Sequence, residues 1–147
     1  MLENCLVSKA HLLNLPEGKE DAIRAAVAAM ADAVKLDADE VFEAVMERER
    51  VMSTGMGHGV AIPHAKIKGL KKFHVSFSRA SAPIDYQSLD STPVRILVLL
   101  LSPEDKTKEH VKLLTEITKR LKFSAVRQAF LDAKSTGEME KAIIEHK

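Results

Sequence analysis

The chain has 147 residues, of which 46% are apolar and 29% charged, which fits one globular domain spanning residues 1–147. Its 22 basic and 21 acidic side chains nearly cancel, which argues against nucleic acid or an anionic membrane as the main partner. No apolar run nears the roughly 18 residues of a membrane helix, and a lone cysteine cannot form an internal disulfide, so we expect a cytoplasmic protein without membrane insertion.

The first part of the chain is predicted to contain one edge strand and two helices. Residues 10–15 are short, apolar and followed by proline, which is typical of an edge strand or an extended lead-in. A helical repeat begins at Glu20. Its apolar face consists of Ile23, Ala26, Val27, Met30 and Val34. A second helix, capped by Asp37 or Asp39, is predicted to end near Arg50. Its buried stripe consists of Val41, Phe42, Val45 and Met46.

The middle of the chain is predicted to form short strands. Residues 60–62 are apolar, and Val75 and Phe77 are predicted to form a second short strand with Ser76 between them; the segment 66–72 has the composition of a polar connection. Residues 83–86 and 88–93 have the composition of turns on either side of a short extended piece.

The last part of the chain is predicted to contain one buried strand and three helices. Residues 94–101 are an almost unbroken run of β-branched and leucine side chains, which indicates a central strand covered by helices on both faces; residues 102–103 end it. Helices are predicted over 107–121, 124–133 and 136–144. Their buried residues are expected to be His110, Leu113, Leu114, Ile117, Leu121, Val126, Ala129, Phe130, Met139 and Ile143. The predicted elements follow the order helices, strands and helices along the chain, which indicates an α/β or α+β layered domain.

A glycine-rich segment follows the second predicted helix. Gly55, Gly57 and Gly59 leave little side-chain bulk, so backbone N–H groups can converge on an anion, and Ser53 and Thr54 add hydroxyl donors. The segment is not a Walker loop, because the lysine and Ser/Thr that should follow the last glycine are missing. It is not a dinucleotide fingerprint either, because the glycine spacing differs and no helix follows. A small anion therefore fits this loop better than a nucleotide.

His64, placed directly after Pro63, is the candidate for covalent chemistry. A neutral imidazole is a good nucleophile near pH 7, and phosphoryl transfer needs little from a protein beyond alignment and charge stabilisation. Arg48 and His110 are the candidates for that stabilisation. A structural alternative remains open for each of the three residues. His64 would be a histidine in a turn, His110 a core histidine on a leucine stripe, and Arg48 a solvated arginine at a helix end.

Metal binding is the weaker alternative. The chain contains His58, His64, His74 and His110, but they fall into no recognised zinc spacing, and no cysteine pair or His-Glu-x-x-His helix is present. We therefore expect no metal and no bound cofactor.

The segment RERVMSTGMGHGVAIPH, residues 48–64, closely resembles the active-site signature of enzyme IIA domains of the bacterial phosphoenolpyruvate-dependent phosphotransferase system. The class that it resembles is the fructose, mannitol and nitrogen-regulatory one. Later landmarks match in order at residues 83–86, 89–94 and 106–110, so the resemblance covers nearly the whole chain.

The resemblance implies a single-domain mixed β-sheet flanked by helices on both faces. It implies that His64 accepts a phosphoryl group from the phosphocarrier protein HPr or its nitrogen-branch relative NPr. Arg48 and His110 match the arginine and second histidine that hold this group. His58 stands at a variable position, from which it could add a third imidazole to the pocket.

The subclass is predicted from smaller features. Residues 63–66 and 105–110 look more like the nitrogen-regulatory branch, in which the phosphorylation state controls partner proteins. The alternative is a sugar-specific IIA that passes the group to a IIB component during fructose- or mannitol-type uptake. Because the chain contains no IIB or IIC segment, we expect a free-standing protein in either case.

Overall fold

The computed structural model describes residues 1–145, which contain a six-stranded sheet and five α-helices. The strands are β1 (Leu12–Leu15), β2 (Gly55–Gly57), β3 (Val60–Ala61), β4 (His64–Ile67), β5 (His74–Ile84) and β6 (Val94–Pro103). The helices are α1 (Lys19–Val34), α2 (Ala38–Val51), α3 (Thr107–Leu121), α4 (Ser124–Asp132) and α5 (Thr136–Ile144). No helix within residues 1–145 is long and apolar enough to cross a membrane.

The sheet is mixed, with the order β1-β5-β6-β3-β2, and β4 also pairs with β6. β5 runs antiparallel to β6, whereas β3 and β4 both run parallel to it. β3 pairs Val60 with Ile96, and β4 pairs His64 with Leu100, so both strands follow β6 in one register. His64 therefore begins a strand whose position along β6 is fixed.

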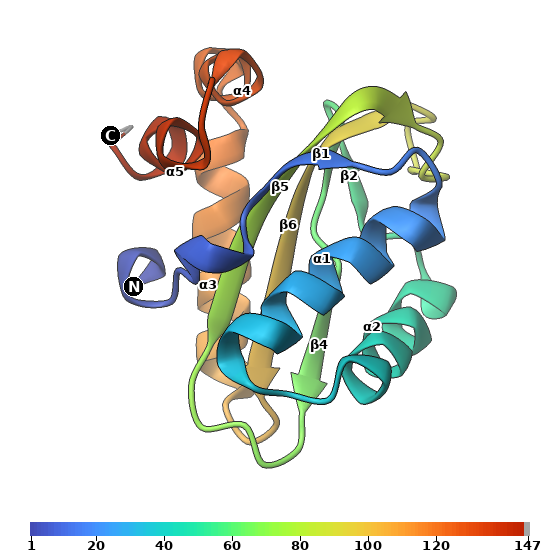
Figure 1. Ribbon diagram of the computed structural model, residues 1–147, viewed down its shortest axis with the longest axis vertical. Coiled ribbons are helices and arrows are strands. Elements are labelled where there is room, and N and C mark those ends of the chain that lie inside the picture. The colour runs from blue at the N-terminus through green and yellow to red at the C-terminus, as the bar shows by residue number, and fades with distance from the viewer. Residues whose placement is uncertain (146–147) are drawn as a thin grey trace.

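The central strand β6 divides the core into two clusters, because successive side chains of a strand point to opposite faces. Leu97, Leu99 and Leu101 pack with α1 and α2. Ile96, Val98 and Leu100 pack with α3, α4 and α5. Figure 1 shows these two helical layers on opposite sides of the sheet. The predicted α/β architecture, a mixed sheet flanked by helices on both faces, is confirmed.

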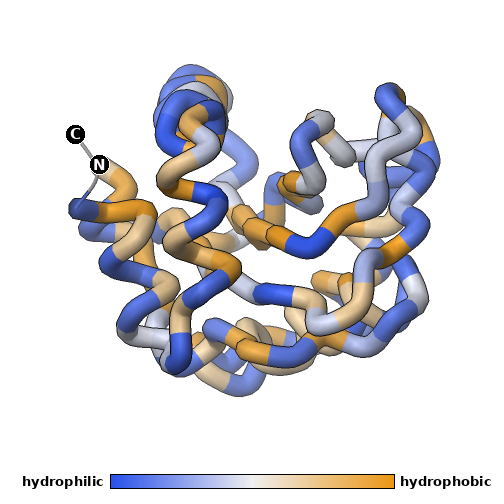
Figure 2. Tube along the Cα trace, turned by 90° about the horizontal axis from the view of Figure 1, so that it is seen from above, coloured by the Kyte–Doolittle hydropathy of each residue, from blue (hydrophilic) through white to orange (hydrophobic). Residues whose placement is uncertain are grey.

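The helices begin and pack as their sequences dictate. Asp37 caps α2, since its Oδ1 accepts a hydrogen bond from the backbone N–H of Glu40 at 3.1 Å. Ser135 caps α5 in the same way. Along the helices in Figure 2, apolar and hydrophilic segments alternate, as expected for helices with one buried face.

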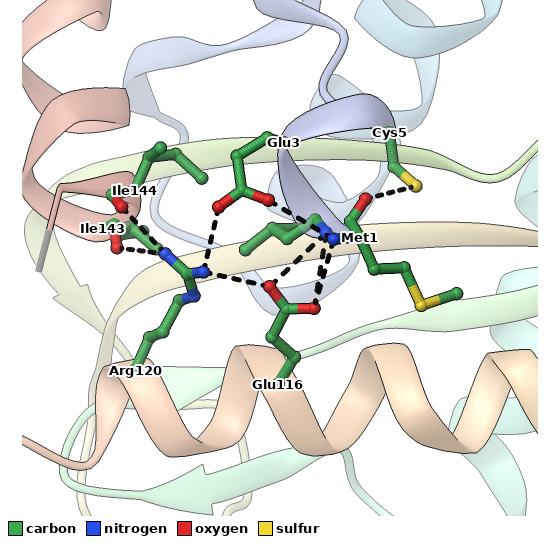
Figure 3. A network of polar contacts seen from close by, with 8 residues as sticks. Met1, Glu3, Cys5, Glu116, Arg120, Ile143 and Ile144 are labelled. Atoms are coloured by element: carbon green, nitrogen blue, oxygen red, sulfur yellow. Dashed lines mark hydrogen bonds and ion pairs between the residues drawn. The ribbon is translucent and has the colours of Figure 1, made fainter. Parts of the chain in front are cut away.

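α3 is fixed to both chain ends by one arginine, drawn in Figure 3. Arg120 donates from Nη1 to the carbonyls of Ile143 and Ile144, each at 3.0 Å, at the C-terminal end of α5. Its Nη2 lies 3.0 Å from carboxylate oxygens of Glu3 and Glu116. This network orients the helix that carries His110.

Two predictions about the middle of the chain were wrong. The glycine segment was predicted as a loop, but Gly55–Gly57 forms β2, which pairs antiparallel with β3. Residues 83–86 were predicted as a turn, but β5 continues to Ile84, which pairs with Val94. The register is irregular between Arg79 and Ile84, which accommodates Pro83 because proline has no N–H for the ladder.

Two smaller predictions also differ from the structure. β6 extends through Ser102 and Pro103, because β4 pairs with these residues along the edge. Ala129 was expected to be buried but is exposed, since the short helix α4 buries only Val126 and Phe130, one turn apart.

Candidate functional site

His64 stands at the sheet edge formed by β4, between the ends of α2 and α3 that line the same cleft. Its Nδ1 lies 2.8 Å from the backbone carbonyl of Ile62. A carbonyl can only accept a hydrogen bond, so Nδ1 carries the proton and Nε2 keeps a free lone pair. Burial lowers the pKa of His64 below its usual value, and the positive charges of Arg48 and Lys66 lower it further, against the opposing effect of the Ile62 carbonyl. The ring is therefore neutral near pH 7, with its lone pair on Nε2.

His110 lies close to His64, although the two residues are far apart in sequence. Their ring centroids are 5.2 Å apart, with planes tilted by 58°. His110 comes from the first turns of α3 and is only 5% exposed. Burial lowers its pKa to about 4, and the neighbouring charges of His64, Lys66 and Arg48 act in the same direction. His110 is thus both a buried residue of α3 and part of the wall of the cleft.

Arg48 belongs to the last turn of α2, where its Nη1 donates to the carbonyl of Met52 at 2.8 Å. This contact satisfies a carbonyl at the helix end, as the structural interpretation of Arg48 expects. The same side chain also lines the cleft of about 620 Å³ that contains both histidines. The structure therefore brings together Arg48, His64 and His110, the three residues singled out by the sequence.

The cleft is electropositive. Besides Arg48 it is lined by Lys66, whose Nζ donates to Thr107 Oγ1 at 3.1 Å. Glu47 is the one acidic residue among the side chains that line it. A multiply charged anion is favoured in such a setting because each cation contributes in a partly desolvated space.

The glycine segment is divided between two hollows. Ser53, Thr54 and Gly55 line a hollow of about 300 Å³ together with Arg48 and His64. Their polar groups are already used inside the protein: Ser53 Oγ accepts from the N–H of Gly55 at 3.1 Å and donates to the carbonyl of Tyr86 at 3.3 Å. This part of the segment adjoins His64 but is bonded to itself and its neighbours.

The remaining residues of the segment lie elsewhere. Gly57 and His58 line a separate hollow against α3, and this hollow does not include His64 or His110. Gly57 and Gly59 both have positive φ, as does His58 between them, which gives the turn between β2 and β3 its shape. The carbonyl of Gly59 accepts hydrogen bonds from the backbone of β6.

A buried polar network behind the loop was not identified from the sequence. Glu49 is 5% exposed, and its carboxylate accepts from the N–H of Thr54 at 3.0 Å and from Lys19 Nζ at 3.2 Å. Thr54 Oγ1 also lies 3.0 Å from the hydroxyl of Tyr86. Burial and the charge of Glu49 raise the pKa of Tyr86, so its hydroxyl stays protonated. Glu49 continues the four-residue spacing of the buried Val45, which is the signal that could have revealed it.

Exposed apolar side chains surround the site. Val51, Met56, Leu89 and Val111 are between 47% and 81% exposed, and each lines one of the hollows around His64 or next to it. Apolar groups gathered at the rim of a charged cleft are typical of a surface that another protein covers. In residues 1–145, no three His, Cys, Asp or Glu side chains lie close enough together to hold a metal ion.

The chain is similar to known proteins over nearly its whole length. Residues 8–146, which include every residue of the cleft, match the family described as "Phosphoenolpyruvate-dependent sugar phosphotransferase system, EIIA 2". A "Nitrogen regulatory protein" of Pseudomonas aeruginosa is 32% identical over 146 residues, covering 98% of this chain and 95% of the relative. A "PTS system fructose-specific EIIA component" of Haloferax volcanii is 32% identical over 131 residues, covering 88% and 85%. The crystal structure of the nitrogen regulatory protein IIA-Ntr from Neisseria meningitidis has a TM-score of 0.90 at 27% identity, covering 97% of this chain and 98% of the other.

Proposed function

This chain belongs to the phosphoenolpyruvate-dependent sugar phosphotransferase system EIIA 2 family, and we propose that it carries a phosphoryl group on Nε2 of His64. The observation that supports this is the hydrogen bond from His64 Nδ1 to the carbonyl of Ile62, which leaves Nε2 unprotonated in a cationic cleft. Only a ring nitrogen with a free lone pair can attack phosphorus, and in His64 this nitrogen is Nε2.

The transfer step is an exchange of one bond to phosphorus for another. The donor is a phosphohistidine of HPr or NPr. The lone pair of His64 Nε2 attacks the phosphorus, the new N–P bond forms, and the bond to the donor nitrogen breaks with its electron pair returning to the donor. No proton has to leave His64, because the Nδ1–H stays on the Ile62 carbonyl.

Neighbouring groups stabilise the charge of the transferred group. Arg48 and His110 act as donors to its oxygens, and Lys66 adds a positive charge within the same cleft. Ser53, Thr54 and Gly55 act from behind His64, by holding the loop in place through their own hydrogen bonds. Gly57 and Gly59 contribute through the turn that they form between β2 and β3.

The proposed donor and the proposed downstream partner are both proteins. The exposed apolar side chains around the cleft, including Val51 and Val111, offer a surface that a folded partner would cover. A small phosphorylated metabolite would leave these side chains in water, so they favour a protein donor.

The main proposal for the downstream step is regulation, in which the phosphorylation state of His64 controls partner proteins. It is supported by relatives named for nitrogen regulation, one of which matches nearly the whole chain in sequence and another in structure. A dianionic group in the cleft changes both the charge that a partner meets and the cost of desolvating the surface it covers. The alternative, transfer to a IIB component, is supported by the fructose-specific relative with the same 32% identity.

The carrier function is tested with phosphoenolpyruvate labelled in its phosphoryl group, enzyme I and either HPr or NPr. We expect one acid-labile, base-stable label in the wild-type protein and none in His64→Ala. His74→Ala, which removes another partly buried histidine, is the control and should keep the full label. Label retained by His64→Ala would refute the assignment.

The two downstream functions are separated with the purified phosphorylated protein. Incubation with fructose-type and mannitol-type IIB proteins should leave the label on His64 if the regulatory proposal holds. Rapid transfer to a cysteine or histidine of one IIB protein would establish the sugar-specific alternative instead.

A further inference from the structure

A buried serine contacts the second histidine of the cleft. Ser102 lies near the end of β6, beneath the first turns of α3, and is fully buried. Its Oγ is 2.6 Å from Nδ1 of His110, a short distance for a hydrogen bond between a hydroxyl and an imidazole. Ser102 pairs in the sheet with Lys66, two residues beyond His64 on the same strand, so both sides of the cleft are tied to β6.

The direction of this hydrogen bond decides which nitrogen of His110 carries the proton. A neutral imidazole has one N–H, and a hydroxyl can either donate or accept. His110 is the hydrogen-bond partner found for Ser102 Oγ within residues 1–145. If Nδ1 carried the proton, the Ser102 hydroxyl proton would be buried without an acceptor, which is costly. The neutral state therefore has Ser102 donating to Nδ1, with the ring proton on Nε2.

The two histidines are thus held in opposite tautomers by partners of different chemistry. The Ile62 carbonyl, which can only accept, keeps the proton of His64 on Nδ1 and leaves Nε2 as a nucleophile. The Ser102 hydroxyl, which can donate, keeps the proton of His110 on Nε2. With the opposite tautomer, His110 would direct a lone pair rather than a donor into the cleft that it lines with His64.

We propose that Ser102 is a positioning residue for phosphoryl transfer: its hydroxyl holds His110 in the Nε2–H tautomer, so that Nε2–H donates to an oxygen of the phosphoryl group on His64. The inference rests on the proposed function of His64. No bond to Ser102 is made or broken in the transfer step, because its hydroxyl proton stays between Oγ and Nδ1. The lowered pKa of His110, about 4, agrees with a neutral ring in the unphosphorylated protein.

The tautomers are measured directly by NMR of protein labelled with ¹⁵N-histidine, at pH 7 and without phosphorylation. We expect His110 to show an unprotonated Nδ1 and a protonated Nε2, and His64 to show the reverse. In Ser102→Ala the His110 pattern should change to a mixture or to the other tautomer, while the His64 pattern stays the same. A protonated Nδ1 on wild-type His110, or an unchanged pattern in Ser102→Ala, would overturn the proposal.

The consequence for transfer is measured as the rate at which His64 accepts label from the phosphorylated donor protein. Ser102→Ala should slow it about 10-fold, the effect of losing one oriented hydrogen bond to a charged group. Ser102→Thr, which keeps a hydroxyl, should recover most of the rate. The matched control is Ser76→Ala, since Ser76 is equally buried but lies on β5 opposite Leu99 and away from the cleft. A rate unchanged in Ser102→Ala, or equally reduced in Ser76→Ala, contradicts the assignment.

The two proposals fail in different ways. If His64 accepts no label at all, the carrier function fails, but the ¹⁵N spectra of the unphosphorylated protein still test the Ser102 assignment. If Ser102→Ala does not fold, the wild-type spectra alone test the Ser102 assignment, because they report which nitrogen of His110 carries the proton.

Discussion

Replacing Gly55 by alanine tests why a glycine stands at this position. The sequence suggests that glycines let backbone N–H groups approach an anion. The structure gives another reason, because a Cβ on Gly55 would lie 2.1 Å from Oγ, 2.7 Å from Cβ and 3.0 Å from Cα of Ser88. Ser88 is itself buried, so neither side can move freely.

The loss in the free energy of unfolding can be worked out from the overlap between the added methyl group and Ser88. Carbon atoms pack at about 3.5 to 4.0 Å, so the two segments must separate by roughly 1 Å to admit the methyl group. Overpacking of this kind costs about 1–3 kcal/mol. Gly55→Ala should therefore lower the free energy of unfolding by about 2 kcal/mol, and the urea midpoint by about 1 M at a typical slope.

The assay is urea unfolding followed by far-ultraviolet circular dichroism, with Gly137→Ala as control. Gly137 lies in α5, and its nearest neighbour to a built Cβ is Ser135 Oγ at 3.8 Å, so this variant should be neutral or slightly stabilising. In the double variant with Ser88→Gly, the two worst overlaps disappear while the 3.0 Å contact with the Cα remains. The coupling energy between Gly55→Ala and Ser88→Gly should then be at least about 1 kcal/mol. The double variant should regain part, but not all, of the free energy of unfolding that Gly55→Ala loses.

The opposite results would show that the packing argument is wrong. If Gly55→Ala unfolds at the wild-type urea concentration but accepts phosphoryl groups poorly, the glycine serves anion binding. If Ser88→Gly gives no rescue, the overlap with Ser88 is not the cause of the loss.

Further expectations concern titration and the buried network. NMR titration of His110 should give a midpoint near pH 4, because burial and the adjacent positive charges disfavour its protonated form. His11 accepts from the N–H of Phe77 at 3.0 Å, and burial lowers its pKa below 6.5. The stabilisation that neutral His11 provides is therefore fully present above about pH 6.5. It is lost as the pH falls, because the unfolded chain takes up a proton on His11 more readily than the folded protein does. Urea unfolding at pH 7.5 and 5.5 should show a smaller pH dependence in His11→Gln than in wild type. Tyr86→Phe should cost about 1 kcal/mol by losing its contact with Thr54.

The sequence was a good guide wherever a local pattern carried the information. The four-residue spacing of apolar residues placed α2 and α3, and the uninterrupted apolar run placed β6 at the centre of the sheet. The family resemblance placed Arg48, His64 and His110 in one site, and the structure brings them to the same cleft.

Two strands near His64, β2 and β4, were missed because their stability is not local. Pro63 and the lysines after it read as a turn and a polar connection, yet His64–Ile67 forms β4 because β6 supplies its hydrogen-bonding partner. Gly55–Gly57 is a strand for the same reason, since it pairs with β3. Propensity disfavours glycine in strands, and only the tertiary pairing overrides it.

The protonation pattern of the site could not be predicted, and the reason differs for the two histidines. The partner of His64 is the backbone carbonyl of Ile62, an atom that every residue has, so no side chain in the sequence marks it. The partner of His110 is a side chain, but Ser102 appeared to be only a strand terminator, since nothing local shows that α3 lies above it. The sequence can therefore identify both histidines of such a site. It cannot show which imidazole attacks phosphorus and which one donates a hydrogen bond, because this depends on the groups that the fold places next to each Nδ1. This makes the Ser102 variants more informative than removal of His110, because they change the position of one proton and leave the ring in place.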